Sequence, residues 1–373
     1  TPNGTLPDDS HELLAFRFGT TIYSTGVNDQ KLVDNNVGGA GGVFTPLKMR
    51  ALPVSILPET GRSTYFIGLG QLADNIDNGS DNGTTNPFEA SSTDPLTGAE
   101  IASFLTDGVQ GLDLGTNVTN IPGGTPIRFN LSANGITPGE VGDAIPDILV
   151  SQSASPSPGT DELRFVDSGG ATVGNVLSLD ITNEPTVGDW QVDFYEFDST
   201  QPRSRFINTP RPLFFFAVDL DAFGITTGVG GNVGDAVALI YTPNGTSDPS
   251  FIAFNEPSLG VASQLSVETQ PTEQICDGTL PSDITVQLQD QSGAIVEQAN
   301  IAITASLETG PGDFTPGSTI TQLTAANGLA TFNDLAFTIG GPHSIRFSFA
   351  NLDVAITTEI GNAIGCVDTQ WIG

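Results

Sequence analysis

The apolar residues of this chain fall into short runs, and this pattern limits its fold more than any other feature. Runs such as DILVSQ (147–152) and WQVDFYE (190–196) are bounded by Gly, Pro, Asn or Asp. No segment repeats apolar residues with the period of an amphipathic helix. Short runs that recur about every ten residues are typical of β-sandwiches and β-barrels. The sequence therefore predicts an all-β protein.

Turn-forming residues indicate where the chain reverses. The 373 residues include 44 glycines and 25 prolines, which supply the backbone conformations that tight turns need. Two runs around Ser-Gly-Gly (168–170) predict a hairpin, and so do the runs around Pro-Asn-Gly (243–245). Further hairpin turns are expected at 290–293 and at Asn-Gly (327–328).

Two segments read as strands of different kinds. ELLAFRFGTTIYSTG (12–26) reads as one strand with Leu13, Ala15 and Arg17 on the same face. PRPLFFFAV (210–218) is the most apolar stretch. It predicts a central strand that is buried on both faces, with Pro210 and Pro212 at its start, where a missing N–H is tolerated.

The composition changes near residue 260, which predicts two domains, 1–260 and 261–373. For the first domain we expect a large β-sandwich of jelly-roll-like form. In the second, Ile284, Val286 and Leu288 alternate with polar residues, as expected for a strand with one buried face.

Three segments of the second domain resemble a known class of domain. They are VQLQDQSG (286–293), TQLTAANGLATFNDLAF (321–337) and GPHSIRFSF (341–349). This pattern is similar to the bacterial immunoglobulin-like domains of the invasin and intimin type, and the resemblance covers about 100 residues, from about 263 to 366. It implies an immunoglobulin-like β-sandwich and says almost nothing about a ligand.

The two cysteines, Cys276 and Cys366, lie at the two ends of this second domain. We expect a disulfide between them, because a catalytic cysteine needs a nearby histidine and an electropositive site. A bond that closes so long a loop would stabilise the fold by roughly 4–5 kcal/mol. The alternative is two unpaired thiols.

The charge of the chain is strongly one-sided. It has 43 acidic and 11 basic residues, for a formal net charge of −32. Such a surface repels phosphate backbones and anionic lipids, so we expect no nucleic-acid partner and no direct membrane insertion. The charge is typical of solubility in a secreted protein, and a role in gathering divalent cations is the alternative. The chain starts at Thr1 without Met, which suggests a processed product or an excised fragment.

The sequence offers little material for catalysis. It has two histidines, His11 and His343, in different predicted domains, and His343 is expected to be exposed in a turn. There is no G-x-S-x-G, no P-loop, no G-x-G-x-x-G and no cluster of His and Cys for zinc. Acids are too common for one glycosidase-like pair to stand out. We therefore predict no catalytic residues and no enzyme.

Calcium is the one cofactor that the sequence suggests. Asp143 and Asp147 flank a turn, and Asp219 and Asp221 lie at the end of a strand. Carboxylate oxygens at such spacing can bind calcium, and these four are the candidate ligands. The acidic stretch 74–83 fails the EF-hand pattern. For each of these sites, the alternative is a solvated turn or an aspartate cap.

Five phrases of the first domain carry a second resemblance. They are FGTTIYSTGVNDQKL (18–32), SFLTDGVQGLDLGTNVTNIPGG (103–124), DAIPDILVSQSA (143–154), DELRFVDSGGATVGN (161–175) and VGDWQVDFYEFD (187–198). Together they resemble the N-terminal region of large gliding-motility-associated surface adhesins that Bacteroidetes export by type IX secretion. The resemblance spans about 13–221 and implies surface display and adhesion. It supplies no catalytic residues, and the chain has no recognisable C-terminal sorting domain.

The leading hypothesis is an extracellular cell-surface protein with a structural or adhesive role that acts by display and contact. Its partners would be other surface proteins or glycans, with a homo-oligomer possible. The polar stretch 74–98 and the edge strands are the expected contact surfaces. Two alternatives remain open: a subunit of an extracellular fibre or ring, joined by strand addition, and a carbohydrate-binding module or glycan-active enzyme.

Overall fold

The structure, a computed structural model, describes residues 11–55, 57, 66–72, 98–121, 123–124, 126–152, 159–196, 203–245, 247–271, 280, 282–349, 352–358 and 360. Strands dominate these residues, and the helices α1 (Asp29–Asp34) and α2 (Gly98–Ser103) are each six residues long. The protein is therefore all-β, as its sequence predicts. Of the helices within the described ranges, none has the length and apolar character needed to cross a membrane.

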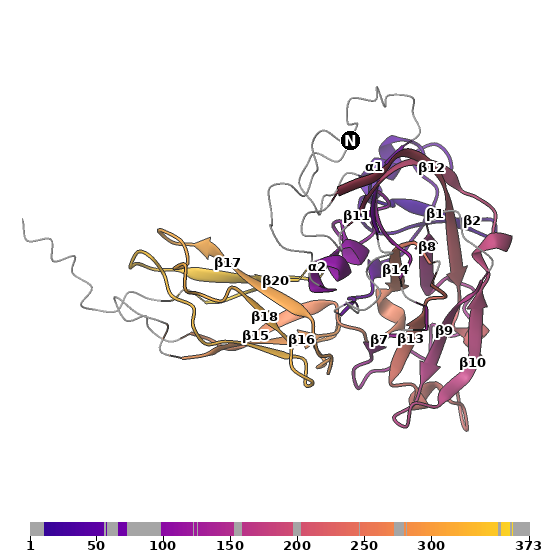
Figure 1. Cartoon of the computed structure of the whole chain (residues 1–373). Coiled ribbons are helices and arrows are strands. Elements are labelled where there is room, and N and C mark those ends of the chain that lie inside the picture. The colour runs from indigo at the N-terminus through magenta and orange to yellow at the C-terminus, as the bar shows by residue number, and fades with distance from the viewer. Residues whose placement is uncertain are drawn as a thin grey trace, which may run out of the picture.

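The described strands form five sheets, which divide into two bodies (Figure 1). The apolar clusters mark the division: Val261 belongs to the core of the first body and Ala262 to the core of the second. In Figure 1 the yellow and orange strands of the second body lie together at the left. Whether each body folds as an independent domain stays a prediction.

The first body is built around one seven-stranded sheet. In the order of the sheet, its strands are β4 (Met49–Ala51), β14 (Pro249–Asn255), β8 (Ile148–Gln152), β12 (Arg203–Val218), β11 (Gly188–Glu196), β5 (Phe66–Leu72) and β6 (Thr116–Thr119). The strands β8 and β14 are buried along their whole length. Ile148 and Val150 face one apolar cluster, and Leu149 between them faces another. Burial on both faces explains why these strands read as nearly continuous apolar runs.

Two smaller sheets cover the two faces of this central sheet. On one face lie β10 (Thr172–Leu179), β9 (Asp161–Val166), β13 (Ala238–Thr242) and β7 (Ile127–Asn130). On the other lie β1 (Ala15–Phe18), β2 (Thr21–Ser24) and β3 (Thr45–Pro46), whose Phe16 and Tyr23 share a cluster with Leu149. This small sheet adds a third layer that the sequence did not predict.

Short 3₁₀ helices complete the first body. They are η2 (Phe104–Thr106), η3 (Ile181–Asn183), η4 (Leu220–Phe223), η5 (Val233–Asp235) and η6 (Glu256–Ser258). Leu105 and Ile101, from η2 and the adjoining α2, are fully buried in the main core. The segment formed by α2 and η2 therefore contributes to the apolar core between the sheets.

The segment 12–26 forms two strands, so the single strand predicted for it was wrong. Strands β1 and β2 form an antiparallel hairpin in which Phe18 pairs with Thr21. Gly19 lies at the turn with φ of 57°, a left-handed conformation that glycine adopts without a steric penalty. Within β1, Phe16 is buried and Arg17, on the opposite face, is exposed.

Not all of the predicted hairpins pair as hairpins. The turn at 168–170 joins β9 to β10, which pair antiparallel as predicted. The turn at 243–245, however, leads from β13 in one sheet to β14 in another. The turn at 327–328 likewise crosses between the two sheets of the second body. Turn chemistry reverses the chain locally, but it does not decide which strand becomes the neighbour.

The prolines of β12 lie inside the strand and not at its start, contrary to the prediction. Residues up to Leu213 pair with β11, and residues from Phe214 onward pair with β8. The C=O of Leu213 faces β11, since it accepts the N–H of Val187 (2.9 Å). Main-chain groups alternate between the two edges of a strand. The backbone nitrogens of Pro210 and Pro212 therefore lie on the β8 side of β12, beyond Gln152, the last residue of β8. Their missing N–H groups cost no ladder hydrogen bond.

The second body consists of two sheets around one core. One sheet has the order β15 (Gln264–Thr269), β16 (Ile284–Gln289) and β19 (Leu329–Phe332), and the other has β18 (Thr321–Leu323), β17 (Ala302–Thr309), β20 (Ser344–Ser348) and β21 (Ala355–Ile356). Phe332 and Phe347 meet across the core, with ring centroids 4.9 Å apart. Two sheets on a common core agree with the immunoglobulin-like prediction at this coarse level, and the finer assignment stays a prediction.

The two bodies meet at a hydrogen-bonded contact, which we call the junction and which contains Ser132, Asn134, Asp290 and Gln298. The carboxylate of Asp290 accepts hydrogen bonds from the Ser132 hydroxyl and the Asn134 amide, both at 2.7 Å. The Gln298 amide in turn donates to the C=O of Pro53 (3.2 Å). Each body therefore supplies donors and acceptors to the other.

An ion-pair network adjoins the junction. Arg50 is buried and pairs with Glu256, which is also buried. A second nitrogen of Arg50 lies 3.1 Å from the carboxylate of Asp353 in the second body. Lys48, whose side chain is largely exposed, lies 3.0 Å from Glu256 as well. The amide of Gln291 completes the contact by donating to the backbone carbonyl oxygen of Glu256.

The connecting residues 260–263 are hydrogen-bonded to both bodies. Gly260 exchanges main-chain hydrogen bonds with Ser132 and Gly135 of the first body, at 2.7 and 2.8 Å. Ser263 exchanges them with Gln289 and Asp353 of the second, at 3.0 and 2.9 Å. The connection therefore has no free stretch that could serve as a hinge.

Candidate functional site

The four predicted calcium ligands fall in one region of the first body. Asp219 accepts hydrogen bonds from the N–H groups of Gly142 (2.9 Å) and Ala144 (2.8 Å). Asp147 accepts the N–H of Leu220 (2.9 Å) and the hydroxyl of Ser258. These carboxylates thus hold the loop before β8 against the end of β12.

The other two candidates differ in their surroundings. Asp143 is exposed and accepts the N–H of Ile145 in a turn of its own (2.8 Å). Asp221 is exposed as well, and its N–H donates a hydrogen bond to the carboxylate of Asp219 (3.0 Å). In the part of the chain that the structure describes, no group of three or more His, Cys, Asp or Glu side chains is arranged to hold a metal ion.

Burial shifts the pKa of Asp147, one of the four candidate ligands. Its side chain is fully buried, and desolvation raises its pKa to about 7, against hydrogen bonds from Ser258 and Leu220 that lower it. The nearby carboxylates of Asp219 and Asp143 raise the pKa further. Calcium binding by this cluster stays a prediction. It is tested by whether calcium raises the melting temperature more than magnesium does at high ionic strength.

Several predicted features lie outside the described residues. They are Cys276 and Cys366 with their expected disulfide, the acidic stretch 74–83, and nearly all of the polar stretch 74–98. The disulfide and these contact surfaces therefore stay predictions.

His343 is fully buried, so the exposed position expected for it was wrong. Its ring stacks on Phe337 with centroids 3.8 Å apart. Its two ring nitrogens lie 2.7 Å from the C=O of Gly341 and 3.0 Å from the C=O of Pro311. The side chain therefore fastens two loops of the second body to each other.

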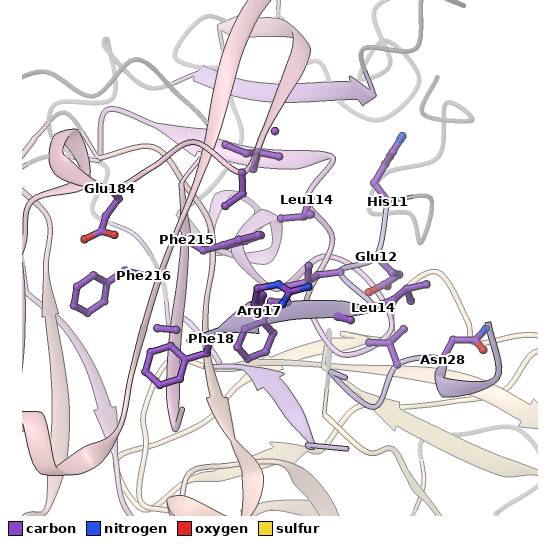
Figure 2. Close-up of a pocket in the computed structure, with 18 of the residues that line it drawn as sticks. His11, Glu12, Leu14, Arg17, Phe18, Asn28, Leu114, Glu184, Phe215 and Phe216 are labelled. Atoms are coloured by element: carbon purple, nitrogen blue, oxygen red, sulfur yellow. The ribbon is translucent and has the colours of Figure 1, made fainter. Parts of the chain in front are cut away.

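The candidate functional site is a cavity of about 950 Å³ in the first body, which we call the slot. It lies between β1 and β12 and is also bounded by residues 184–188 (Figure 2). Its size is at the upper end of what small-molecule sites usually have. Phe18, Phe215 and Phe216 supply aromatic surface, and Figure 2 shows how they lie around the opening.

Charged side chains of both signs line the slot. Arg17 and Lys31 are exposed, and neither forms an ion pair with a residue in the described ranges. On the acidic side, the carboxylate of Glu12 accepts the N–H of Val109, and Glu184 is half-buried. Arg17 projects from the middle of β1, so it is the cation that the strand itself places at the slot.

The slot follows one edge of β1. Consecutive residues of a strand point to opposite faces, yet every residue from Leu13 to Gly19 lines the cavity. The cavity therefore runs along the edge of the strand and does not lie over one face. The N–H of Leu13 donates to the C=O of Leu112 (2.9 Å) on the side away from β2. By alternation, Ala15 and Arg17 direct their main-chain groups to that same side.

The slot also follows one edge of β12. Phe215 and Phe216 both line it, although they point to opposite faces of the sheet. Beyond Leu213 this strand has lost β11 and pairs with β8 alone. Phe215 and Ala217 direct their main-chain groups to the side that β11 has left. Within the described ranges, no strand pairs with either of these two edges.

No protein-family model matches the chain, and no curated protein matches its sequence. The resemblance to gliding-motility adhesins therefore stays a prediction.

Sequence reasoning missed the slot because each of its walls looked like an ordinary strand. The apolar run 213–217 predicts a strand that is buried on both faces. In the structure, Phe215, Phe216 and Ala217 are half-buried and line the slot. One signal was present: Arg17 stands between Phe16 and Phe18 in a chain with few cations.

Proposed function

We propose that this chain is an extracellular surface protein that acts by display and contact and not by catalysis. The observation that carries the proposal is the junction between the two bodies. Polar contacts cross it at Asp290, Gln298 and Arg50, and the connecting residues are bonded on both sides. A protein that presents a binding face on a support benefits when the two parts cannot swing independently.

The charge and the chemistry support the same proposal. A net charge of −32 suits solubility in an exposed, crowded environment. Catalysis needs a tuned acid, base, nucleophile or metal held in geometry. The sequence offers two histidines, of which His343 is used to fasten loops.

Adhesion and catalysis are separated by one experiment on the full chain. Beads coated with the protein are placed under flow on a panel of immobilised glycans and extracellular proteins, and the same panel is assayed for hydrolysis. We expect retention on at least one surface without turnover. Turnover of a glycan or peptide that one or two acidic substitutions abolish, in protein that stays folded, would contradict the proposal. So would the absence of retention on every surface.

The alternatives left open by the sequence give different results. A fibre or ring subunit would form regular particles in negative-stain images and elute as a large species in size-exclusion chromatography. A carbohydrate-binding module would be retained on glycans and on no protein surface.

A further inference from the structure

We propose that the slot binds an extended segment of a partner polypeptide, which adds to the open strand edges by main-chain hydrogen bonds and places a carboxylate against Arg17. The inference rests on the proposed function as a contact protein, and it names the class of partner and the place of contact.

The main chain carries the first step of the argument. Ala15 and Arg17 on β1, and Phe215 and Ala217 on β12, direct N–H and C=O groups into the same cavity. Unpaired strand edges are templates for a further strand. An extended peptide satisfies such groups in the regular pattern that they present, and a small compact ligand satisfies few of them.

The shape of the slot carries the second step. It runs beside consecutive residues of β1, from Leu13 to Gly19, so its long direction is that of the strand. The N–H of Leu13 on this side is already bonded to Leu112, and Glu12 bridges to Asp113, so the edge available to a segment begins at Ala15. Strand residues rise about 3.3 Å each, and the stretch from Ala15 to Gly19 accommodates a short extended segment. The side chains of that segment point alternately to either side. The phenyl rings of Phe18, Phe215 and Phe216 are placed to receive apolar ones.

Charge carries the third step. The chain has 11 basic residues against 43 acidic ones, yet Arg17 and Lys31 lie together at the slot without an ion pair to the described residues. A carboxylate on the incoming segment would accept charge-assisted hydrogen bonds from Arg17. The opposing carboxylate of Glu12 is engaged with the N–H of Val109. The preferred segment therefore alternates apolar residues with polar ones and carries an acid beside Arg17.

The same charge favours a different protein over a second copy as the source of the segment. Two molecules that each carry −32 repel one another as they approach. A partner with a smaller negative charge is repelled less. If it exposes one acidic, extended segment, that segment is still attracted to Arg17.

The test uses the full chain and a display library of random linear dodecapeptides as the probe. Peptides are selected on the wild-type protein alone. The best binder is synthesised with a fluorescent label, and its affinity is measured by anisotropy. Two N-methylated versions are made, one for each alternate set of residues, because N-methylation removes the main-chain donors that strand addition requires.

We expect selected peptides to alternate apolar and polar residues and to contain an acid. Arg17→Glu should weaken binding about tenfold or more, as for loss of a charge-assisted hydrogen bond. Arg128→Glu makes the same change of charge on β7, outside the slot, and should leave binding nearly unchanged. Each N-methylated version should bind more weakly than the unmodified peptide, because one set of N–H groups faces β1 and the other faces β12.

A second variant tests the edge itself. Ala15→Pro removes an N–H that faces the slot, and it leaves the bonds between β1 and β2 in place. It should weaken peptide binding even if Arg17→Glu has little effect on the best binder.

Three outcomes would overturn the inference. One is that no peptide binds in a way that depends on Arg17 or Ala15. Another is that the slot variants abolish self-association of the protein, which would make a second copy the occupant. The last is that they abolish glycan binding, which would make the slot a sugar site. If coated beads still adhere when the slot variants no longer bind peptide, or never did, the proposed function stands and its contact lies elsewhere.

Discussion

At the scale of single residues, buried carboxyl groups set the pH response of the first body. Asp248 is almost fully buried and accepts the N–H of Asn120 (2.8 Å). Desolvation raises its pKa to about 7, although this hydrogen bond and the charge of Arg211 lower it. The pKa of Asp147 is likewise raised to about 7. An aspartate that binds its proton more tightly when folded favours the folded state at low pH.

The substitution Asp248→Asn should flatten the dependence of stability on pH. The pKa of Asp248 rises from 3.8 to about 7 on folding. Its contribution is therefore fully present below about pH 4 and is lost as the pH rises through about 7, a change on the order of 3–4 kcal/mol. Asparagine is neutral at every pH and keeps the acceptor for Asn120. Denaturant unfolding at pH 5 and pH 8 measures the difference.

The control for this prediction is Asp235→Asn. Asp235 is exposed, so its removal changes the net charge equally without removing a buried acid. Both variants are compared at high ionic strength, which suppresses the general effect of −32 charges. An unchanged pH dependence in Asp248→Asn would contradict the buried-acid explanation.

Arg50 and Lys48 allow a matched test of burial, because both pair with Glu256. Arg50→Met leaves a buried carboxylate without its main partner, which should cost about 3–5 kcal/mol of unfolding free energy. Lys48 is 70% exposed at its side chain, so Lys48→Met should cost less than about 1 kcal/mol. Urea unfolding of both variants decides the point, and equal effects would show that burial of the pair is not what matters.

At the scale of elements, glycines decide where strands can turn against their neighbours. Gly328 has φ of 75°, and a Cβ there would lie 2.0 Å from the C=O of Val296. The turn at 327–328 crosses between two sheets, so it passes close to the main chain of another segment. Gly293, in the turn at 290–293, has φ of 87° and has only the end of a glutamine side chain nearby, at 3.8 Å.

We therefore expect Gly328→Ala to destabilise the protein more than Gly293→Ala does, although both glycines have left-handed backbone conformations and lie in the same body. Gly293→Ala should cost about 1–2 kcal/mol, the penalty of a left-handed alanine. Gly328→Ala adds a clash with main-chain atoms, which should bring the cost to roughly 4 kcal/mol or more. Thermal unfolding of the two variants measures the difference in stability. Similar melting temperatures would show that the turn at 327–328 relaxes to make room for the added methyl group.

At the scale of the whole molecule, Asp290 joins the two bodies. Burial alone raises the pKa of this carboxyl, but hydrogen bonds from Ser132, Ser292 and Asn134 and from the main chain outweigh burial and lower it. A lowered pKa means that the contribution to stability is present above the unfolded pKa near 3.8 and is lost as the pH falls through the folded value. Acid below the unfolded pKa of 3.8 should therefore weaken the junction.

The double variant Ser132→Ala, Asn134→Ala tests whether the junction makes the bodies unfold together. It removes both side-chain donors from the first body to Asp290, which should cost about 2–3 kcal/mol at the interface. In calorimetry we expect one transition for the wild type and two for the double variant. Thr319→Ala is the control, because the Thr319 hydroxyl donates to the carboxylate of Asp334 and both residues belong to the second body. Two transitions already in the wild type would contradict the coupling.

Local pattern determined much of the molecule from the sequence alone. The strands at 127–130, 148–152, 161–166 and 284–289 were recognisable, because alternation and apolar runs follow from what one strand buries. The turns were recognisable too, because glycine and asparagine adopt the left-handed conformations that turns require more readily than other residues do. The change of composition near residue 260 lies beside the division between the two cores at Val261 and Ala262.

Tertiary structure alone decided which strands became neighbours and which edges stayed open. Nothing local in 238–255 tells that β13 and β14 join different sheets, because pairing depends on segments far away in the sequence. Burial of His343 and of Asp147 likewise depends on loops that pack over them. The slot exists because β12 changes partners at Leu213 and leaves Phe215 and Ala217 facing β1 across a cavity. An open edge is a property of two strands and of the strand missing between them, so no single stretch of sequence contains it.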